Sequence, residues 1–91
     1  MAAHRGEFIA LGTGRPFTYE TQSWKDSKNE QHTDIEDSDL PYVDTMILKI
    51  TDINTKEVGY QTVTGPMLDW EFVEDVLAYD WGEEGTQPTR R

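Results

Sequence analysis

The clearest pattern in this chain is an alternation of apolar and polar residues after position 42. Val43 to Ile53 is rich in β-branched and apolar side chains, and Met46, Leu48 and Ile50 share one face by the two-residue period of a strand. Polar turn-forming residues follow at 52–56, and alternation resumes from Glu57 to Thr64. The pattern predicts an antiparallel β-hairpin.

A second hairpin is predicted near the N-terminus. The segments Glu7 to Leu11 and Phe17 to Trp24 have the composition of short strands, and Gly12-Thr13-Gly14-Arg15-Pro16 between them is typical of a turn. Within the second strand, the two-residue period separates one face from the other: Phe17, Tyr19 and Thr21 against Thr18, Glu20 and Gln22.

A helix is expected from Pro66 to Tyr79, because Pro is favoured at a first helical position and Thr64-Gly65 precedes it. The helical period places one set on the apolar side: Leu68, Phe72, Val73, Val76, Leu77 and Tyr79. The opposite side receives Glu71, Glu74, Asp75 and Ala78. Gly82 is a natural stop, and residues 83–91 are predicted to be a frayed tail.

The segment from Lys25 to Pro41 has Ile35 and Leu40 as its large apolar residues. A stretch that buries so little does not offset its own ordering entropy, so we expect a mobile acidic loop at about 25–41. The chain is long enough for one domain over residues 1–91. The predicted fold is α+β: two hairpins forming a mostly antiparallel sheet of about four strands, with the helix packed on one face.

The distribution of charged residues excludes some classes of function. The net charge is −10, and no Lys, Arg or His lies between Lys56 and Arg90. Such a surface repels nucleic acid phosphates and anionic lipids, so direct binding to either is disfavoured. The chain has no Cys and no apolar run of membrane-spanning length. We therefore expect a protein of the cytoplasm.

No motif predicts an enzyme, a metal site or a cofactor. His4 and His32 have no evident orienting partner and are interpreted as solvated surface residues. The Gly12 to Arg15 run lacks the spacing of a phosphate loop, and the acidic loop lacks the Gly and Glu positions of an EF-hand.

The helical carboxylates are not explained by helix stability. Glu71, Glu74 and Asp75 stand three and four residues apart, where like charges are mildly destabilising. Aromatic residues beside an acidic face are typical of protein interfaces, although at least one tryptophan is expected in the core. The predicted partner-binding residues are Asp34, Glu36, Asp37, Asp39, Trp70, Glu71, Glu74, Asp75, Asp80, Glu83 and Glu84.

The first hypothesis is an inhibitor that occupies a basic, nucleic-acid-binding surface of another protein, as a DNA mimic does. Phage-encoded inhibitors of host defence, including anti-CRISPR and antirestriction proteins, share this size and charge; for such a viral protein the compartment is the host cytoplasm. Several acidic elements, or a homodimer, would have to converge to approach the charge density of a duplex.

Three other classes stay open. An immunity or antitoxin-like partner of a cationic toxin uses the same electrostatics. A structural or assembly protein, or a salt-adapted domain, explains the acidity as a solubility feature. A small-molecule-binding domain ranks last, because a single helix over a small sheet leaves little room for an enclosed pocket.

Overall fold

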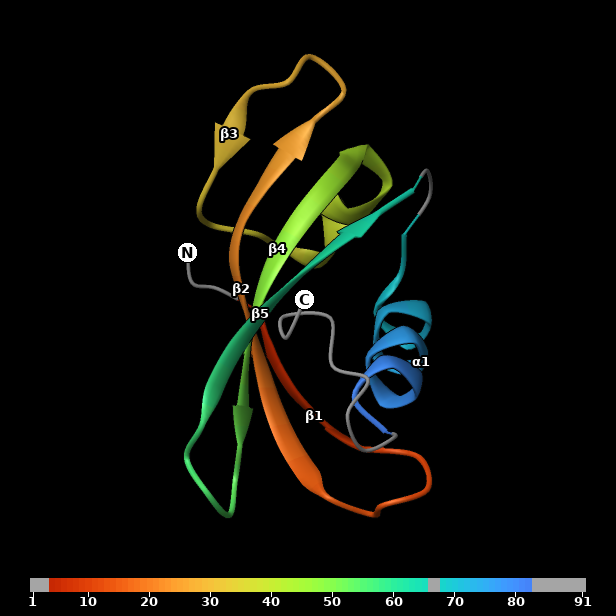
Figure 1. The fold of residues 1–91 in the computed structure, drawn as a ribbon. Helices are drawn as coiled ribbons and strands as arrows, with labels where there is room; N and C mark the ends of the chain where they lie inside the picture. The colour runs from red at the N-terminus through yellow and green to blue at the C-terminus, as the bar shows by residue number, and fades with distance from the viewer. Residues whose placement is uncertain (1–3, 66–67, 83–91) are drawn as a thin grey trace.

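The computed structural model describes residues 4–65 and 68–82, and within them the predicted α+β fold is confirmed (Figure 1). The elements are listed here in chain order: β1 (Arg5–Ile9), β2 (Pro16–Asp26), β3 (Gln31–His32), the 3₁₀ helix η1 (Asp37–Tyr42), β4 (Val43–Asp52), β5 (Val58–Thr64) and α1 (Trp70–Asp80). The antiparallel sheet has the order β1-β2-β4-β5, and β3 also pairs with β2.

Strands β2 and β4 form the centre of the sheet and join the two predicted hairpins. Their register places Tyr19 opposite Ile50 and Trp24 opposite Met46. A β-bulge between Thr21 and Ser23 shifts the alternation by one residue, so Trp24 joins the inner face. On its other edge, the long strand β2 pairs with β1 along its first half and with β3 near its end.

The core lies between the sheet and α1, as the sequence pattern predicts. Met46, Leu48 and Ile50 of β4 are fully buried, and so are Phe17 and Tyr19 of β2. Aromatic contacts and the remaining apolar side chains extend this core beneath the helix: Phe8, Ala10, Val63, Leu68, Val73, Leu77 and Trp81. Figure 1 shows α1 on one side of a strongly twisted sheet.

The helix begins later than the sequence predicts. The first helical residue is Trp70, and the predicted start at Pro66 lies outside the described residues. Asp69 is the N-cap: its Oδ1 accepts the backbone N–H of Phe72 at 2.8 Å. A carboxylate at this position satisfies a free N–H and interacts favourably with the helix dipole, which is why the helix begins there.

The predicted apolar side of the helix is partly wrong. Val73 and Leu77 are buried, but Phe72 is 49% exposed and Tyr79 is 69% exposed. Ala78, predicted on the polar side, instead packs partly buried against the core. Val73 and Leu77 form the stripe that is buried against the sheet, and the aromatic residues beside this stripe stay in solvent.

The segment predicted as a loop at 25–41 contains more regular structure than expected. It holds the end of β2, the strand β3 and most of η1. Ile35 and Leu40 are both buried, and Trp24 Nε1 donates a hydrogen bond of 2.9 Å to the backbone oxygen of Asp34. Two apolar anchors and one indole are enough to fix this segment against the sheet.

Within the described residues, α1 is too short and too polar to cross a membrane, and no other helix there meets that requirement.

The C-terminal end of α1 contacts the loop after β1, where the Leu11 N–H donates to the Ala78 carbonyl at 3.0 Å. Gly82 follows in close contact with that loop, since a Cβ there would lie 2.3 Å from the Leu11 carbonyl oxygen.

Candidate protein-binding surface

A single hydrogen bond joins the two acidic segments of the sequence. Trp70, the first residue of α1, donates from its indole Nε1 to Asp37 Oδ1 of η1 at 3.0 Å. The two residues are far apart in the chain, and nothing in the local pattern predicts the contact. The acidic start of η1 and the acidic start of α1 therefore lie side by side.

The Trp70 ring is fixed on its other side by His4. The two rings are stacked, with centroids 3.6 Å apart and an interplanar angle of 5°. His4 is half-buried, so the prediction that it is a solvated surface residue is wrong. Burial lowers the pKa of His4 below its ordinary value, and the nearby carboxylates of Asp37 and Glu74 oppose that shift only in part.

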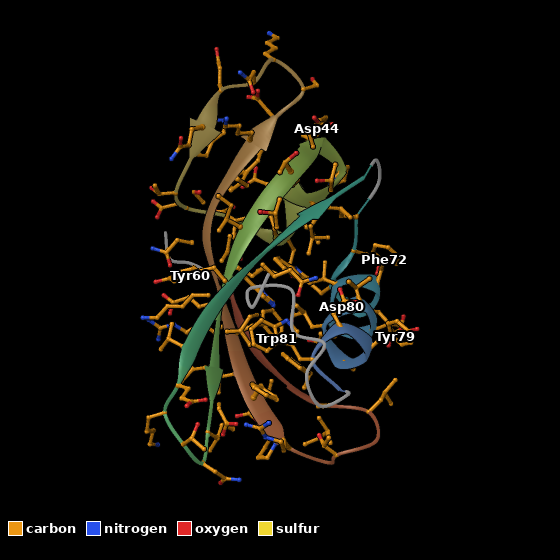
Figure 2. All side chains as sticks on the ribbon, viewed as in Figure 1. Asp44, Tyr60, Phe72, Tyr79, Asp80 and Trp81 are labelled. Carbon is orange, nitrogen blue, oxygen red and sulfur yellow. The ribbon has the colours of Figure 1, made fainter. Side chains whose placement is uncertain are left out.

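The exposed side of α1 combines two acids with two aromatic rings. Glu71, Phe72, Asp75 and Tyr79 are all exposed and follow one another at helical spacing. Figure 2 shows Phe72 and Tyr79 pointing away from the sheet. We name these four residues, together with Asp37, the acidic helix surface. The aromatic members were predicted to be core residues, and their exposure is what sequence reasoning missed.

Glu74 does not belong to that exposed set, although the sequence placed it there. It is half-buried, and its Oε2 accepts a hydrogen bond of 2.5 Å from the Tyr19 hydroxyl of β2. Burial raises the pKa of the Tyr19 hydroxyl, and this hydrogen bond to Glu74 raises it further. The Tyr19 proton therefore stays on the phenol, and Glu74 ties the helix to the sheet.

Asp80 is engaged at the other end of the helix. Its Oδ2 accepts a hydrogen bond of 2.7 Å from the Gln61 side-chain amide of β5, and Gln61 in turn accepts one of 2.6 Å from Trp81 Nε1. Trp81 is buried, which agrees with the prediction that at least one tryptophan belongs to the core. Figure 2 places Asp80 and Trp81 toward the sheet.

The remaining predicted contact residues differ in solvent exposure and in hydrogen bonding. Asp34 and Glu36 are exposed just before η1, whereas Asp39 is half-buried and its Oδ2 accepts the Glu36 backbone N–H at 2.9 Å. Glu83 and Glu84 lie outside the described residues. Of the predicted loop acids, Asp34 and Glu36 are therefore exposed like Asp37, and Asp39 is not.

Two basic side chains lie on the side of the sheet away from α1. Arg5 of β1 and Lys49 of β4 lie on the sheet face opposite α1, around a shallow hollow that also includes Glu20. Arg5 approaches Glu20 at 3.6 Å. The sequence contains no Lys or Arg from 29 to 48 or from 57 to 89, so neither η1 nor α1 carries a cation. Within residues 4–65 and 68–82, no ion pair involves an acid of η1 or α1.

Comparisons with protein-family models, with curated proteins and with solved structures each found no match to this chain.

Proposed function

We propose that this chain binds a positively charged protein through the acidic helix surface. The observation that carries the proposal is the Trp70 to Asp37 hydrogen bond, because it joins two acidic segments into one surface. Unneutralised carboxylates speed and orient association with a basic partner. A surface kept only for solubility normally mixes charges of both signs, whereas η1 and α1 contain acidic residues and no Lys or Arg.

The exposed aromatic residues support a protein as the partner. Duplex DNA carries one charge per about 1.7 Å of axis, whereas successive residues of a helix rise by about 1.5 Å and only some of them here are acidic. The charge of α1 alone is therefore a sparse copy of a nucleic acid. Phe72 and Tyr79 supply what charge does not, since exposed aromatic rings are frequent anchors at protein interfaces.

We infer that the partner is a nucleic-acid-binding protein and that the chain inhibits it in the cytoplasm by covering its basic groove. A groove that binds phosphates presents the charges that this surface complements. A phage-encoded inhibitor of host defence, such as an anti-CRISPR protein, fits this proposal. An immunity protein for a cationic toxin is the second candidate, because the same surface serves both.

The test compares two charge-reversal variants of equal net charge. Glu71→Lys/Asp75→Lys alters the acidic helix surface. Glu7→Lys/Glu57→Lys alters exposed acids on β1 and in the β4–β5 turn. Both changes raise the net charge of −10 by the same four units. Each bait, and the unchanged chain, is used to isolate partners from the native host, and the partner is purified for affinity measurements.

The proposal predicts that the unchanged chain and the Glu7/Glu57 variant bind the same basic protein and displace its nucleic acid, while the Glu71/Asp75 variant does not. Phe72→Ala should weaken that binding by at least about tenfold, as expected for an aromatic anchor. Equal binding by both charge variants contradicts the surface assignment. A partner that keeps its nucleic acid when bound contradicts the inhibitor and favours the immunity class.

A further inference from the structure

A second cluster of polar groups lies at the β2–β3 hairpin, at the end of the sheet away from α1 (Figure 1). One carboxylate oxygen each from Asp26 and Glu30 and one imidazole nitrogen of His32 lie within 4.8 Å of one another. We propose that these three side chains bind a divalent transition metal ion of the Zn²⁺ class. This inference is independent of the proposed partner surface.

The donor atoms suit such an ion. Zn²⁺ takes imidazole nitrogen and carboxylate oxygen at about 2.0 to 2.2 Å, commonly in tetrahedral geometry. Two donors on one tetrahedral ion are therefore about 3.3 Å apart. Asp26 Oδ2 and His32 Nε2 are 3.0 Å apart, so only a small separation is needed to admit the ion between them. Mg²⁺ and Ca²⁺ prefer oxygen ligands alone and fit this set less well.

The carboxylate of Asp26 is oriented before any ion arrives. Its Oδ1 accepts the backbone N–H groups of Lys28 at 2.9 Å and of Glu30 at 3.0 Å. This leaves Oδ2 as the oxygen that faces His32. Oδ1 therefore accepts hydrogen bonds from the turn, while Oδ2 can coordinate the ion. The backbone N–H groups orient the carboxylate, as hydrogen-bond partners of metal ligands commonly do.

His32 is oriented by a tryptophan. The two residues are register partners across the β2–β3 pair, and the imidazole stacks on the Trp24 ring with centroids 4.2 Å apart at 21°. His32 is half-buried rather than fully solvated as predicted from the sequence. The ring therefore gives up little rotational freedom on binding an ion, which lowers the entropic cost of forming the site.

The surrounding charges have opposing effects. Asp39 and Lys28 line the same shallow hollow. The Asp39 carboxylate favours a cation there, whereas the Lys28 ammonium opposes it. Glu30 is the third ligand and is exposed, and its side chain makes no hydrogen bond to another described residue. If Asp26 and His32 formed only a structural pair that holds the hairpin, the Glu30 carboxylate would have no role. Substitution of Glu30 therefore distinguishes a metal site from a structural pair.

The test titrates the full chain with zinc chloride in a non-chelating buffer at neutral pH, with calorimetry and His32 imidazole NMR signals as readouts. The proposal predicts one equivalent bound, with the His32 signals shifted and those of His4 unchanged. Glu30→Gln should weaken zinc binding by at least about tenfold without changing the melting temperature of the metal-free chain. Asp26→Asn should also weaken zinc binding, because it replaces a carboxylate ligand with an amide, while the amide oxygen can still accept from the turn.

Two control variants complete the design. Asp34→Asn removes an exposed acid of the same segment, and His4→Gln removes the other histidine; both should bind zinc as the unchanged chain does. Lys28→Gln should bind zinc more tightly, because a repelling charge is removed. Zinc affinity that is unaffected by Glu30→Gln, or that is lost in His4→Gln, overturns the site. Absence of saturable zinc binding in the unchanged chain also overturns it and leaves a structural Asp26 to His32 pair.

Discussion

The Tyr19 hydroxyl of β2 donates a hydrogen bond of 2.5 Å to the Glu74 carboxylate of α1, and this contact fixes how the helix lies on the sheet. The same hydroxyl lies 3.3 Å from His4 Nε2. Because its own proton goes to Glu74, it accepts from His4, which must carry its proton on Nε2. One phenol thus links β2, α1 and the residue that precedes β1.

The first prediction concerns this bond. Tyr19→Phe removes the only hydroxyl that donates to Glu74 among the described residues and leaves a half-buried carboxylate short of a donor. The free energy of unfolding, measured by urea titration, should fall by about 1 to 2 kcal/mol. Glu71→Gln is the matched control, since it changes an exposed acid of the same helix and should stay within about 0.5 kcal/mol of the unchanged chain. Equal effects of the two substitutions would contradict this role of Tyr19.

The second prediction concerns Gly6, which lies opposite Tyr19 in the β1–β2 register. A Cβ at position 6 would lie 2.6 Å from the Tyr19 hydroxyl and 2.7 Å from its ring. Gly6→Ala should therefore displace a buried ring and destabilise the fold by about 1 to 3 kcal/mol in thermal or urea unfolding. Glu7→Ala, at the next and exposed position of β1, should have little effect. A neutral Gly6→Ala would show that the ring has space to move.

The third prediction concerns pH. Burial lowers the pKa of His4, so the unfolded chain takes up a proton at this residue at a higher pH than the folded chain does. The contribution of His4 to stability is complete above its unfolded pKa of about 6.5 and declines as the pH falls from there through the lower folded value. Unfolding free energies measured between pH 7.5 and 5 should decline more steeply for the unchanged chain than for His4→Gln. Parallel dependence of the unfolding free energy on pH in the two proteins would contradict this role of His4.

The fourth prediction concerns Asp52, a buried acid at the end of β4. Burial acts to raise its pKa, but the N–H groups of Thr55 and Asn54 and the Arg15 guanidinium outweigh burial, and the pKa is lowered. Its ionised form therefore stabilises the fold above the unfolded pKa, and this contribution is lost as the pH falls through the folded value.

Asp52→Ala should accordingly cost about 2 to 3 kcal/mol at neutral pH, because two turn N–H groups and a guanidinium lose their acceptor. Asp44→Ala, at the exposed opposite end of β4, serves as the matched control and should change the unfolding free energy by no more than about 0.5 kcal/mol. Chemical unfolding at pH 7 measures both. An Asp52→Ala variant as stable as the control would show that Arg15 and the turn find other partners.

The two hairpins and the inner face of the sheet follow from local sequence patterns. Met46, Leu48 and Ile50 recur at every second position, and all three are fully buried, whereas the intervening Ile47 is exposed. Phe17 and Tyr19 follow the same rule. The two-residue period is local, so it survives into the folded state wherever one face of a strand is covered.

Which residues the helix exposes, and which partners its acids find, depend instead on long-range packing. Helical spacing alone allowed Phe72 and Tyr79 to be core residues and Glu74 to be a surface charge. The packing of α1 on the sheet reversed both assignments. The contact of Trp70 with Asp37 likewise joins segments that no local pattern relates. Periodicity fixes which residues share a face, whereas the shape of the opposing surface selects how much of that face is buried and which polar groups meet there.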